Sequence, residues 1–134
     1  IKFIIKNLLP VATIITPNKD EYCKYKKIAK KYKILDGEID SIANYILITD
    51  FLDEKNKIKS RLIKKGKKIT DYTSTKKNKS YHGTGCTLST SIACNIINKK
   101  NIKDAVNISL KYVSKCIKYS YQRGKSQTLT YRYK

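Results

Sequence analysis

The chain has 134 residues, of which 30 are Lys or Arg and 10 are Asp or Glu, so its formal net charge is +20. This length suits one domain, or part of one, that is large enough to bury a hydrophobic core. The apolar opening segment is interrupted by Lys2, Lys6 and Pro10, which excludes a membrane span there. The four cysteines are widely separated and there is one histidine, which argues against a structural zinc site and a disulfide scaffold.

The first predicted elements are a helix and a strand. Residues 1–9 are typical of the end of a helix, and Pro10 predicts its end because the residue before a proline is pushed out of the α region. Residues 11–16 are apolar and β-branched, which predicts a strand buried on both faces, as in parallel sheets. The chain contains no methionine, so we expect further residues upstream of Ile1.

A second helix is predicted next, because apolar and aromatic residues recur at helical spacing from Tyr22 to Tyr32. Asn18 is a suitable N-cap, and Glu21 follows at the spacing of a capping box. The same two residues stand where a parallel strand passes into a helix, at the edge where open α/β sheets bind ligands. Glu21 is therefore also a candidate to hold a water-bound Mg²⁺ beside a phosphate, and the two roles are compatible.

The rest of the chain completes an α/β pattern. A turn is predicted at 36–37 with one helical turn after it, followed by a buried strand at 45–49 that ends at 50–51. An antiparallel hairpin is predicted next, with strands at 58–63 and 69–73 joined through 65–67. A polar loop at 75–80 then leads to helices at 87–98 and 101–121. The last helix has a predicted buried stripe of Ile102, Val106, Leu110, Val113 and Ile117, and its lysines face outward. The tail from residue 123 has no clear period. Right-handed crossovers make the two buried strands parallel, as in half of a doubly wound sheet.

The strongest chemical signal is the glycine-rich segment 81–88, which leads into the helix at 87–98. Glycines let a phosphate approach the backbone closely, and the first turn of a helix offers unpaired N–H groups and partial positive charge. Gly83, Thr84 and Gly85 are therefore a candidate anion cradle. Cys86 lies in the same turn, where the helix dipole favours a thiolate, so it is a candidate proton acceptor. An ordinary turn with Cys86 as a small buried residue fits the spacing equally well.

Three segments in this order and spacing resemble the C-terminal half of the hydroxymethylpyrimidine and phosphomethylpyrimidine kinases, thiamine-pathway enzymes of the ribokinase-like superfamily. The segments are 15–18 with Glu21, the strand at 45–49, and 81–89. The resemblance implies a three-layer α/β/α fold with a mostly parallel sheet. In this fold residues 1–134 would be the C-terminal, ATP-side part of a single kinase domain, and the substrate-binding N-terminal part would lie upstream of Ile1.

The resemblance also implies an activity and its residues. The enzyme would transfer phosphate from ATP to 4-amino-5-hydroxymethyl-2-methylpyrimidine and then to its monophosphate. The turn at 83–85 would be the anion hole for the moving phosphoryl group, and Cys86 matches the family's catalytic base. Asn18 and Glu21 match the element that orders Mg²⁺ and the ATP phosphates. Many members carry Lys-Gly-Gly where this chain has residues 49–51, and some have threonine for the lysine, so Thr49 is a candidate to face the nucleotide.

The sequence is also compatible with other functions. A pyridoxal kinase of the same branch is a close variant, since some of these also carry cysteine after the glycine turn. An inactive remnant or a basic nucleic-acid-binding module would be of another class. The latter is disfavoured, because only three basic residues are arginines and the lysines are spread along the chain, as expected of a gene rich in A and T. We expect a cytoplasmic enzyme with a small-molecule substrate, and a homodimer is a candidate assembly.

Overall fold

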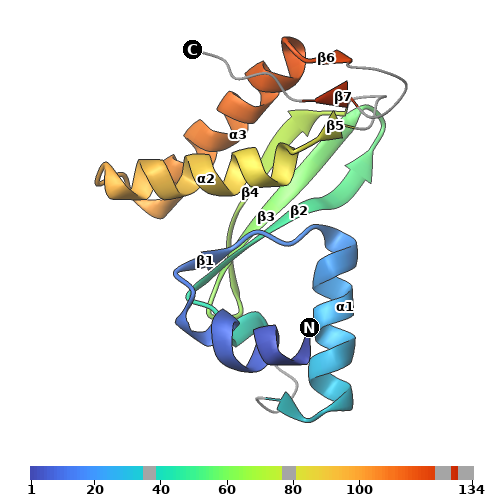
Figure 1. Ribbon diagram of the computed structural model, residues 1–134, viewed down its shortest axis with the longest axis vertical. Helices are drawn as coiled ribbons and strands as arrows, with labels where there is room; N and C mark the ends of the chain where they lie inside the picture. Colours follow the sequence, from blue (N-terminus) through green and yellow to red (C-terminus); the bar gives the residue numbers. More distant parts are fainter. Residues whose placement is uncertain (35–38, 77–80, 123–127, 130–134) are drawn as a thin grey trace. The chain divides into compact units, whose positions relative to one another are not determined.

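The computed structural model describes residues 1–34, 39–76, 81–122 and 128–129. The chain divides into two compact units, Ile1–Lys76 and Lys77–Lys134. Each unit has its own sheet, with strand order β1-β2-β3-β4 in the first and β5-β7-β6 in the second (Figure 1). The turn predicted at 36–37 and most of the loop predicted at 75–80 lie outside the described residues. No helix in the described ranges is long and apolar enough to cross a bilayer.

The first unit is a mixed sheet with helices on one face. Its elements are η1 (Ile4–Leu8), η2 (Leu9–Val11), β1 (Ile14–Ile15), α1 (Lys19–Lys31), η4 (Ile39–Ser41), β2 (Tyr45–Glu54), β3 (Lys57–Lys64) and β4 (Lys67–Thr75). β1 and β2 are parallel, as predicted, whereas β2, β3 and β4 are successively antiparallel. The sheet is thus mixed rather than mostly parallel, because short hairpins can join only antiparallel strands.

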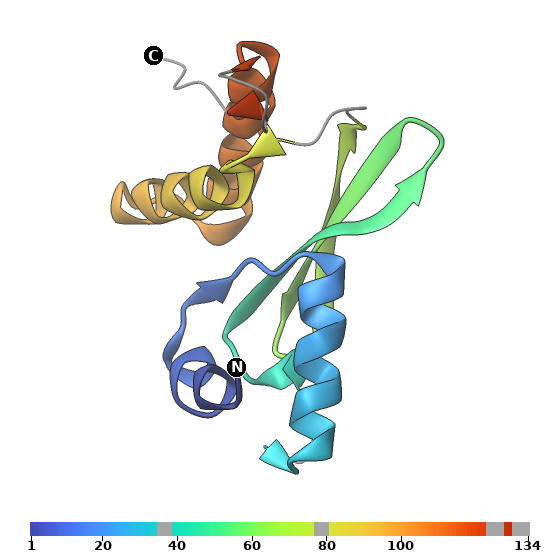
Figure 2. The same cartoon turned by 45° about the vertical axis from the view of Figure 1, so that its right-hand side comes forward.

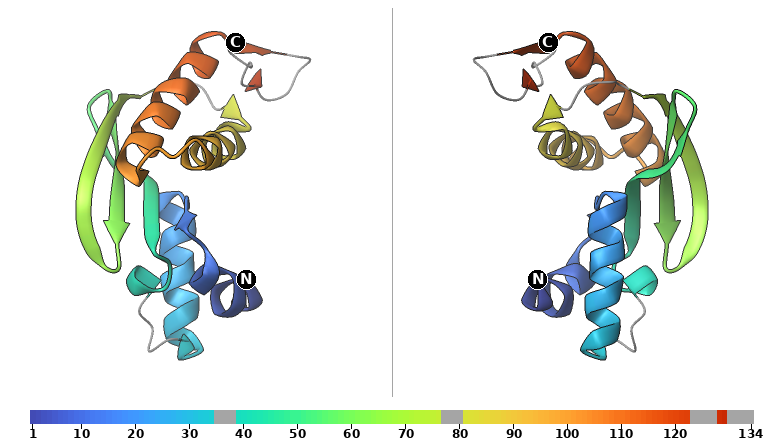
Figure 3. Two further views of the ribbon diagram at one scale, coloured as in Figure 1. Left: turned by 90° about the vertical axis from the view of Figure 1, so that its left-hand side faces the viewer. Right: turned by 90° about the vertical axis from the view of Figure 1, so that its right-hand side faces the viewer.

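The core of the first unit lies between the sheet and the helical segments (Figures 2 and 3). The sheet contributes Ile46, Ile48 and Ile63 to it. The helical segments and the connection before β2 contribute Ile5, Leu9, Tyr22, Ala29, Ile34, Ile39, Ile42 and Ala43. Tyr22 also donates a hydrogen bond to Asp40, so α1 is held to η4 by a polar contact beside the apolar core.

Two predictions for the N-terminal segment are wrong. The chain does not leave the helical region before Pro10, because Leu9 is helical with φ −62° and the chain becomes extended only at Ala12. A proline fits there because the first turn of η2 needs no N–H donor from it. The strand predicted at 11–16 is only the two-residue β1, and its side chains are half-buried. The extent of a strand depends on its neighbours, and within the described residues only β2 pairs with β1.

The β2–β4 part confirms the predicted hairpin and corrects one strand end. β3 and β4 are joined by Lys65 and Gly66, which both have positive φ (44° and 79°), as tight two-residue hairpin turns require. β2 does not end at residues 50–51 but continues to Glu54 and forms a second hairpin with β3. A register shift between Ile48 and Leu52, with Asp50 at φ 54°, carries the strand through this point as a bulge.

The second unit contains the two predicted helices and three short strands. Its elements are β5 (Tyr81–His82), α2 (Thr84–Ile97), α3 (Ile102–Lys118), β6 (Tyr121–Gln122) and β7 (Thr128–Leu129). The short strands were not predicted from the sequence. α2 begins at Thr84 rather than Thr87, because Gly83 in the left-handed region starts the helix earlier, and α3 ends at Lys118 rather than Tyr121.

Helix α3 packs with a stripe that differs partly from the predicted one. Val106 and Val113 are buried as predicted, whereas Ile102, Leu110 and Ile117 are only half-buried. The other buried positions hold small side chains, Ala105, Ser109 and Cys116. Asn95 of α2 donates a hydrogen bond of 3.3 Å to the Ser109 hydroxyl, so α2 lies against these small residues. Small side chains let two helices approach closely, which shifts the buried stripe toward them.

Candidate active site

The first turn of α2 has no side-chain cap. Gly83 is the N-cap residue, with φ 85° and ψ 1°, and no side chain accepts a hydrogen bond from the turn as a cap. Thr87 fixes the Gly83 carbonyl twice, through its backbone N–H at 2.9 Å and its hydroxyl at 2.8 Å. The strand β5, paired in parallel with β7, leads directly into this glycine. The N–H groups of the first helical turn have no intrahelical acceptor, and within the described residues no hydrogen bond from residues 84–86 to a neighbouring segment is seen, so an anion could use them.

Gly85 lies inside this turn, and the structure does not require a glycine there for packing. A Cβ atom added to Gly85 would meet nothing within 4 Å. Glycine in a helix is less favourable than alanine by about 1 kcal/mol, so the helix gains nothing from it. The open space over Gly85 lets a ligand come close to the backbone, as an anion cradle needs.

Cys86 follows in the same turn and is exposed, with a free thiol. The reading of Cys86 as a small buried residue is therefore wrong, because its position in the first turn turns the side chain toward solvent and not toward the core. Ser89 donates hydrogen bonds to the carbonyls of Gly85 (3.0 Å) and Cys86 (3.2 Å), which holds this turn in its helical form. In its thiolate form, an accessible cysteine in the first turn of a helix can accept a proton from a group that attacks a bound phosphate.

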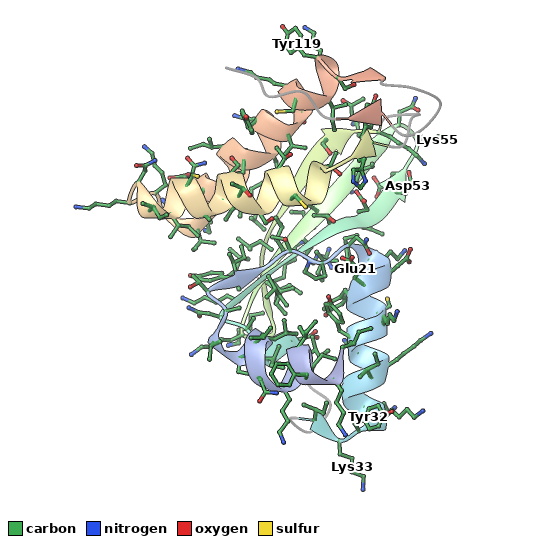
Figure 4. The ribbon with its side chains drawn as sticks, in the orientation of Figure 1. Glu21, Tyr32, Lys33, Asp53, Lys55 and Tyr119 are labelled. Atoms are coloured by element: carbon green, nitrogen blue, oxygen red, sulfur yellow. The ribbon has the colours of Figure 1, made fainter. Side chains whose placement is uncertain are left out.

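In the first unit, Asn18 and Glu21 form the predicted capping box at the start of α1. The Glu21 backbone N–H donates to Asn18 Oδ1 at 2.8 Å, and the Asn18 backbone N–H donates to Glu21 Oε2 at 2.9 Å. Figure 4 shows Glu21 at this end of the helix, and both side chains are exposed. A carboxylate has about four acceptor positions and the cap uses one of them, so Glu21 can also bind water molecules around a cation.

Thr49 lies beside this capping box. It forms a parallel bridge with Asn18, and its backbone N–H donates to the Pro17 carbonyl at 2.9 Å. The structure thus brings Asn18, Glu21 and Thr49 together, at the carboxyl end of the parallel pair β1–β2. This is the edge of an α/β sheet at which ligands bind.

The residues after Thr49 add charges that the sequence pattern did not assign to the site. Burial raises the pKa of Asp50, and the nearby Asp53 carboxylate raises it further. Phe51 packs under the Arg61 guanidinium, 4.1 Å from the ring centre, and Arg61 donates two hydrogen bonds to Asp71, at 2.8 and 3.0 Å. Arg61 and Asp71 are direct partners in the β3–β4 register, and the bulge at Asp50 has no clear signal in a single sequence.

The predicted site residues therefore form two groups, one in each unit. Asn18, Glu21 and Thr49 belong to the first unit, and the turn 83–86 belongs to the second. Within the described ranges no group of three His, Cys, Asp or Glu side chains could hold a metal ion. A Mg²⁺ ion would thus rely on water and on phosphate oxygens for most of its ligands, as it commonly does in phosphoryl-transfer enzymes.

Comparison with known proteins identifies the family. The family described as phosphomethylpyrimidine kinase matches residues 1–130. The chain belongs to this family. No significant match was found among curated proteins.

Solved structures resemble this family member in fold. Pyridoxal kinase from Bacillus subtilis, in an ADP complex, is 23% identical with a TM-score of 0.78, over 96% of this chain and 53% of that one. Pyridoxal kinase from Staphylococcus aureus, in complex with pyridoxal, is 25% identical with a TM-score of 0.77, over 95% and 49%. A candidate phosphomethylpyrimidine kinase from Bacteroides thetaiotaomicron is 18% identical with a TM-score of 0.64, over 87% and 45%. The predicted α/β class is confirmed, and the chain spans about half the length of these structures.

Proposed function

We propose that this chain is the ATP-side part of a cytoplasmic kinase that phosphorylates 4-amino-5-hydroxymethyl-2-methylpyrimidine and then its monophosphate. The observation that carries the proposal is the first turn of α2. It starts at a left-handed Gly83 without a side-chain cap, has open space over Gly85, and exposes the thiol of Cys86. Membership of the phosphomethylpyrimidine kinase family supports the substrate class.

The turn 83–86 would act on the phosphoryl group in flight. The Cys86 thiolate accepts the proton of the substrate hydroxyl, the hydroxyl oxygen forms a bond to the γ-phosphorus of ATP, and the bond from that phosphorus to the leaving oxygen of ADP breaks. Backbone N–H groups of residues 84–86 donate hydrogen bonds to the phosphoryl oxygens as charge builds on them. In the second transfer a phosphate oxygen of the monophosphate attacks in place of the hydroxyl oxygen, and the product is a pyrophosphate.

The group at the start of α1 would serve the nucleotide. Glu21 keeps acceptor positions beyond its capping bond, so it suits a water-bound Mg²⁺, and Thr49 presents a hydroxyl at the same sheet edge. When bound, Mg²⁺ supplies neutralisation of the phosphate charges. Asn18 holds Glu21 in place through the reciprocal cap. This group positions ATP, whereas the turn of α2 acts on the group that is transferred.

A pyridoxal kinase is the second candidate. It is favoured by one observation, the likeness to the Staphylococcus aureus pyridoxal kinase, which was solved with pyridoxal. Both alcohols carry a hydroxymethyl group on an aromatic nitrogen ring, so the chemistry of the turn 83–86 would be the same. The complete kinase, assayed with ATP and each alcohol, separates the two. Turnover of pyridoxal without turnover of the hydroxymethylpyrimidine would select the second candidate.

The proposed base is tested with Cys86→Ala. We expect kcat to fall by about 10² to 10⁴, the range for loss of a general base. Cys94→Ala is the matched control, because Cys94 is another exposed cysteine on the same helix and lies outside the first turn. It should retain normal turnover. Wild-type rates in Cys86→Ala would exclude the role, and an inactive remnant would show no turnover in any variant.

A further inference from the structure

The bulge in β2 is the point at which the sheet of the first unit meets the start of α1. β2 and β3 pair on both sides of it, but three residues of β2, 49–51, face one residue of β3, Ser60. The first of the three, Thr49, forms the bridge with Asn18, and its backbone N–H donates to the Pro17 carbonyl at 2.9 Å. The path of the bulge therefore determines where Thr49 lies relative to the capping box.

The conformation of this bulge needs support from its surroundings. Asp50, the middle residue, has φ 54°, in the left-handed region that glycine adopts freely and other residues adopt at a cost. Such a residue persists only where the contacts around it fix the backbone. The bridge of Thr49 fixes the bulge on the side of α1. The contacts of Phe51 can fix it on the other side.

Phe51, the last residue of the bulge, lies between the core and a guanidinium group. It packs against the hydrophobic core of the first unit. Cζ of Arg61 lies over its ring, 4.1 Å from the ring centre. A cation over the face of an aromatic ring is attracted to it, and the planar guanidinium stacks well on such a face. The position of Phe51 thus depends on the position of Arg61.

Arg61 is in turn held by the next strand, β4. Its register partner is Asp71, and its Nε and Nη2 donate to the two carboxylate oxygens at 2.8 and 3.0 Å. Two such hydrogen bonds fix the plane of the guanidinium. The hydrogen bond from Arg61, and a further one from Lys68, hold the pKa of Asp71 well below its usual range. The carboxylate therefore stays charged and keeps Arg61 in place.

We propose that Arg61 is a positioning residue for the nucleotide. Held by Asp71, its guanidinium fixes Phe51 and, through the bulge, the place of Thr49 beside the capping box of α1. Arg61 acts through these residues and needs no contact with ATP. The inference rests on the proposed function, in which Thr49 and the capping box serve ATP.

The chain offers a comparison for a purely structural ion pair. Lys59 of β3 and Glu54 of β2 lie 2.9 Å apart, outside the bulge. The side chains of Lys59 and Arg61 are similarly exposed, at 31% and 25%. An ion pair of this kind adds little to stability and should have no effect on ligand binding. If Arg61 did no more, its loss would lower the Tm and leave the KM for ATP unchanged.

The first test measures steady-state kinetics of the complete kinase. We expect Arg61→Gln and Arg61→Lys each to raise the KM for ATP about tenfold, because lysine keeps the charge but cannot make the paired hydrogen bonds. The kcat and the KM for the alcohol should change by less than about threefold. Lys59→Gln removes the same charge as Arg61→Gln and should leave all three constants unchanged. An unchanged KM for ATP in Arg61→Gln would overturn the positioning role.

A second test asks whether Arg61 acts through Phe51. Phe51→Leu keeps an apolar side chain but removes the ring under the guanidinium, so the KM for ATP should again rise about tenfold. The double variant with Arg61→Lys should be no worse than either single variant, since both changes break one chain of contacts. A rise of about 100-fold, the product of two independent effects, would overturn the proposed route.

A third test needs no turnover. Hydrogen exchange of the Thr49 amide, which donates to Pro17, reports whether the bulge is held. In the complete kinase we expect exchange about tenfold faster in Arg61→Lys and unchanged in Lys59→Gln. Unchanged exchange in Arg61→Lys would overturn the inference alone. If the wild-type kinase turned over neither alcohol, the proposed function would fail, whereas faster exchange in Arg61→Lys would still support the positioning of Thr49.

Discussion

Helix α1 begins at an asparagine whose side chain caps it, whereas α2 begins at a glycine that has no side chain to offer. In α1 the cap is reciprocal between Asn18 and Glu21, and acidic residues occupy the first turn. α3 follows the same plan, with Asn101 accepting from the Asp104 N–H at 3.0 Å. The first turn of α2 has neither a side-chain cap nor an acidic residue. The positive end of its dipole is therefore not neutralised by its own side chains.

The two kinds of helix start suit different purposes, since a capped start stabilises the helix and an uncapped start can bind a ligand. A good N-cap stabilises a helix by about 1 kcal/mol, and acidic residues in the first turn add a few tenths. α2 lacks the acidic residues, its glycine cap is weaker than an asparagine cap by only about a few tenths of a kcal/mol, and Gly85 costs it more. A sequence that gives up stabilisation at one helix start, while the other two are capped, leaves that start open to an anion. The variants below test this contrast, in order of expected effect.

Among the variants that test this contrast between helix starts, Gly85→Ala in the complete kinase is expected to have the largest effect. The added methyl group meets nothing within 4 Å in the part of the chain that the structure describes, so the free energy of unfolding should stay equal or rise by about 0.5–1 kcal/mol. The same methyl group would hold the phosphoryl group away from the first-turn amides, and turnover should fall by about 100-fold. Thermal unfolding and steady-state kinetics measure the two changes.

Thr90→Ala is the control for this variant, since it adds an alanine at an exposed position of α2 beyond the first turn. It should leave turnover unchanged. Normal turnover in Gly85→Ala would mean that no ligand uses the space over this residue, and the contrast between α2 and the capped helices would then have no functional meaning.

A smaller effect is expected for Glu21→Gln at the capped start of α1. Glutamine also serves in a capping box, so the free energy of unfolding should change by less than about 0.5 kcal/mol. The negative charge is lost, and the Mg²⁺ concentration needed for half-maximal turnover should rise about tenfold. Asp104→Asn removes a charge beside the cap of α3 and should leave the Mg²⁺ dependence unchanged. An unchanged Mg²⁺ titration in Glu21→Gln would limit this residue to capping.

The sequence predicted those parts of the molecule whose signals are local. The capping box of Asn18 and Glu21 and the turn at Lys65 and Gly66 each depend on a few neighbouring residues, and both are confirmed. The bridge between Thr49 and Asn18 was not predictable in the same way, because it depends on the register of two strands. The length of β1 depends likewise on what pairs with it.

In the candidate site, too, the local features were predictable from the sequence and the features that depend on backbone conformation were not. The motif at 83–86 predicted a turn that enters a helix, and the structure confirms this, but the earlier start of α2 follows from the left-handed φ of Gly83. Thr84 and Gly85 are weak helix formers, so propensity alone placed the start too late. The catalytic roles of these residues stay predictions. The sequence showed that residues 49–51, which include Asp50, depart from the family pattern, but it did not predict the β-bulge at Asp50.

The smallest effect is expected for Asp50→Asn, beside the capped start of α1. Burial, and then Asp53, raise the pKa of Asp50 in the folded state, so folding favours its protonated form. The stability contribution of this group therefore falls as the pH rises through that pKa, and its charge costs stability at neutral pH. Asparagine removes the charge and also tolerates the positive φ of 54°.

At pH 7 we expect Asp50→Asn to raise the Tm by about 2 °C, and near pH 3, where Asp50 is largely protonated in both states, we expect little difference. Asp53→Asn is the control, because Asp53 is exposed and pairs with Lys76, so its loss should give no comparable gain. A lower Tm for Asp50→Asn at pH 7 would show that the carboxylate makes a stabilising contact. The sheet edge beside Thr49 would then stabilise a negative charge. A triphosphate needs positive or neutral surroundings, so this result would weaken the assignment of ATP to the group of Asn18, Glu21 and Thr49.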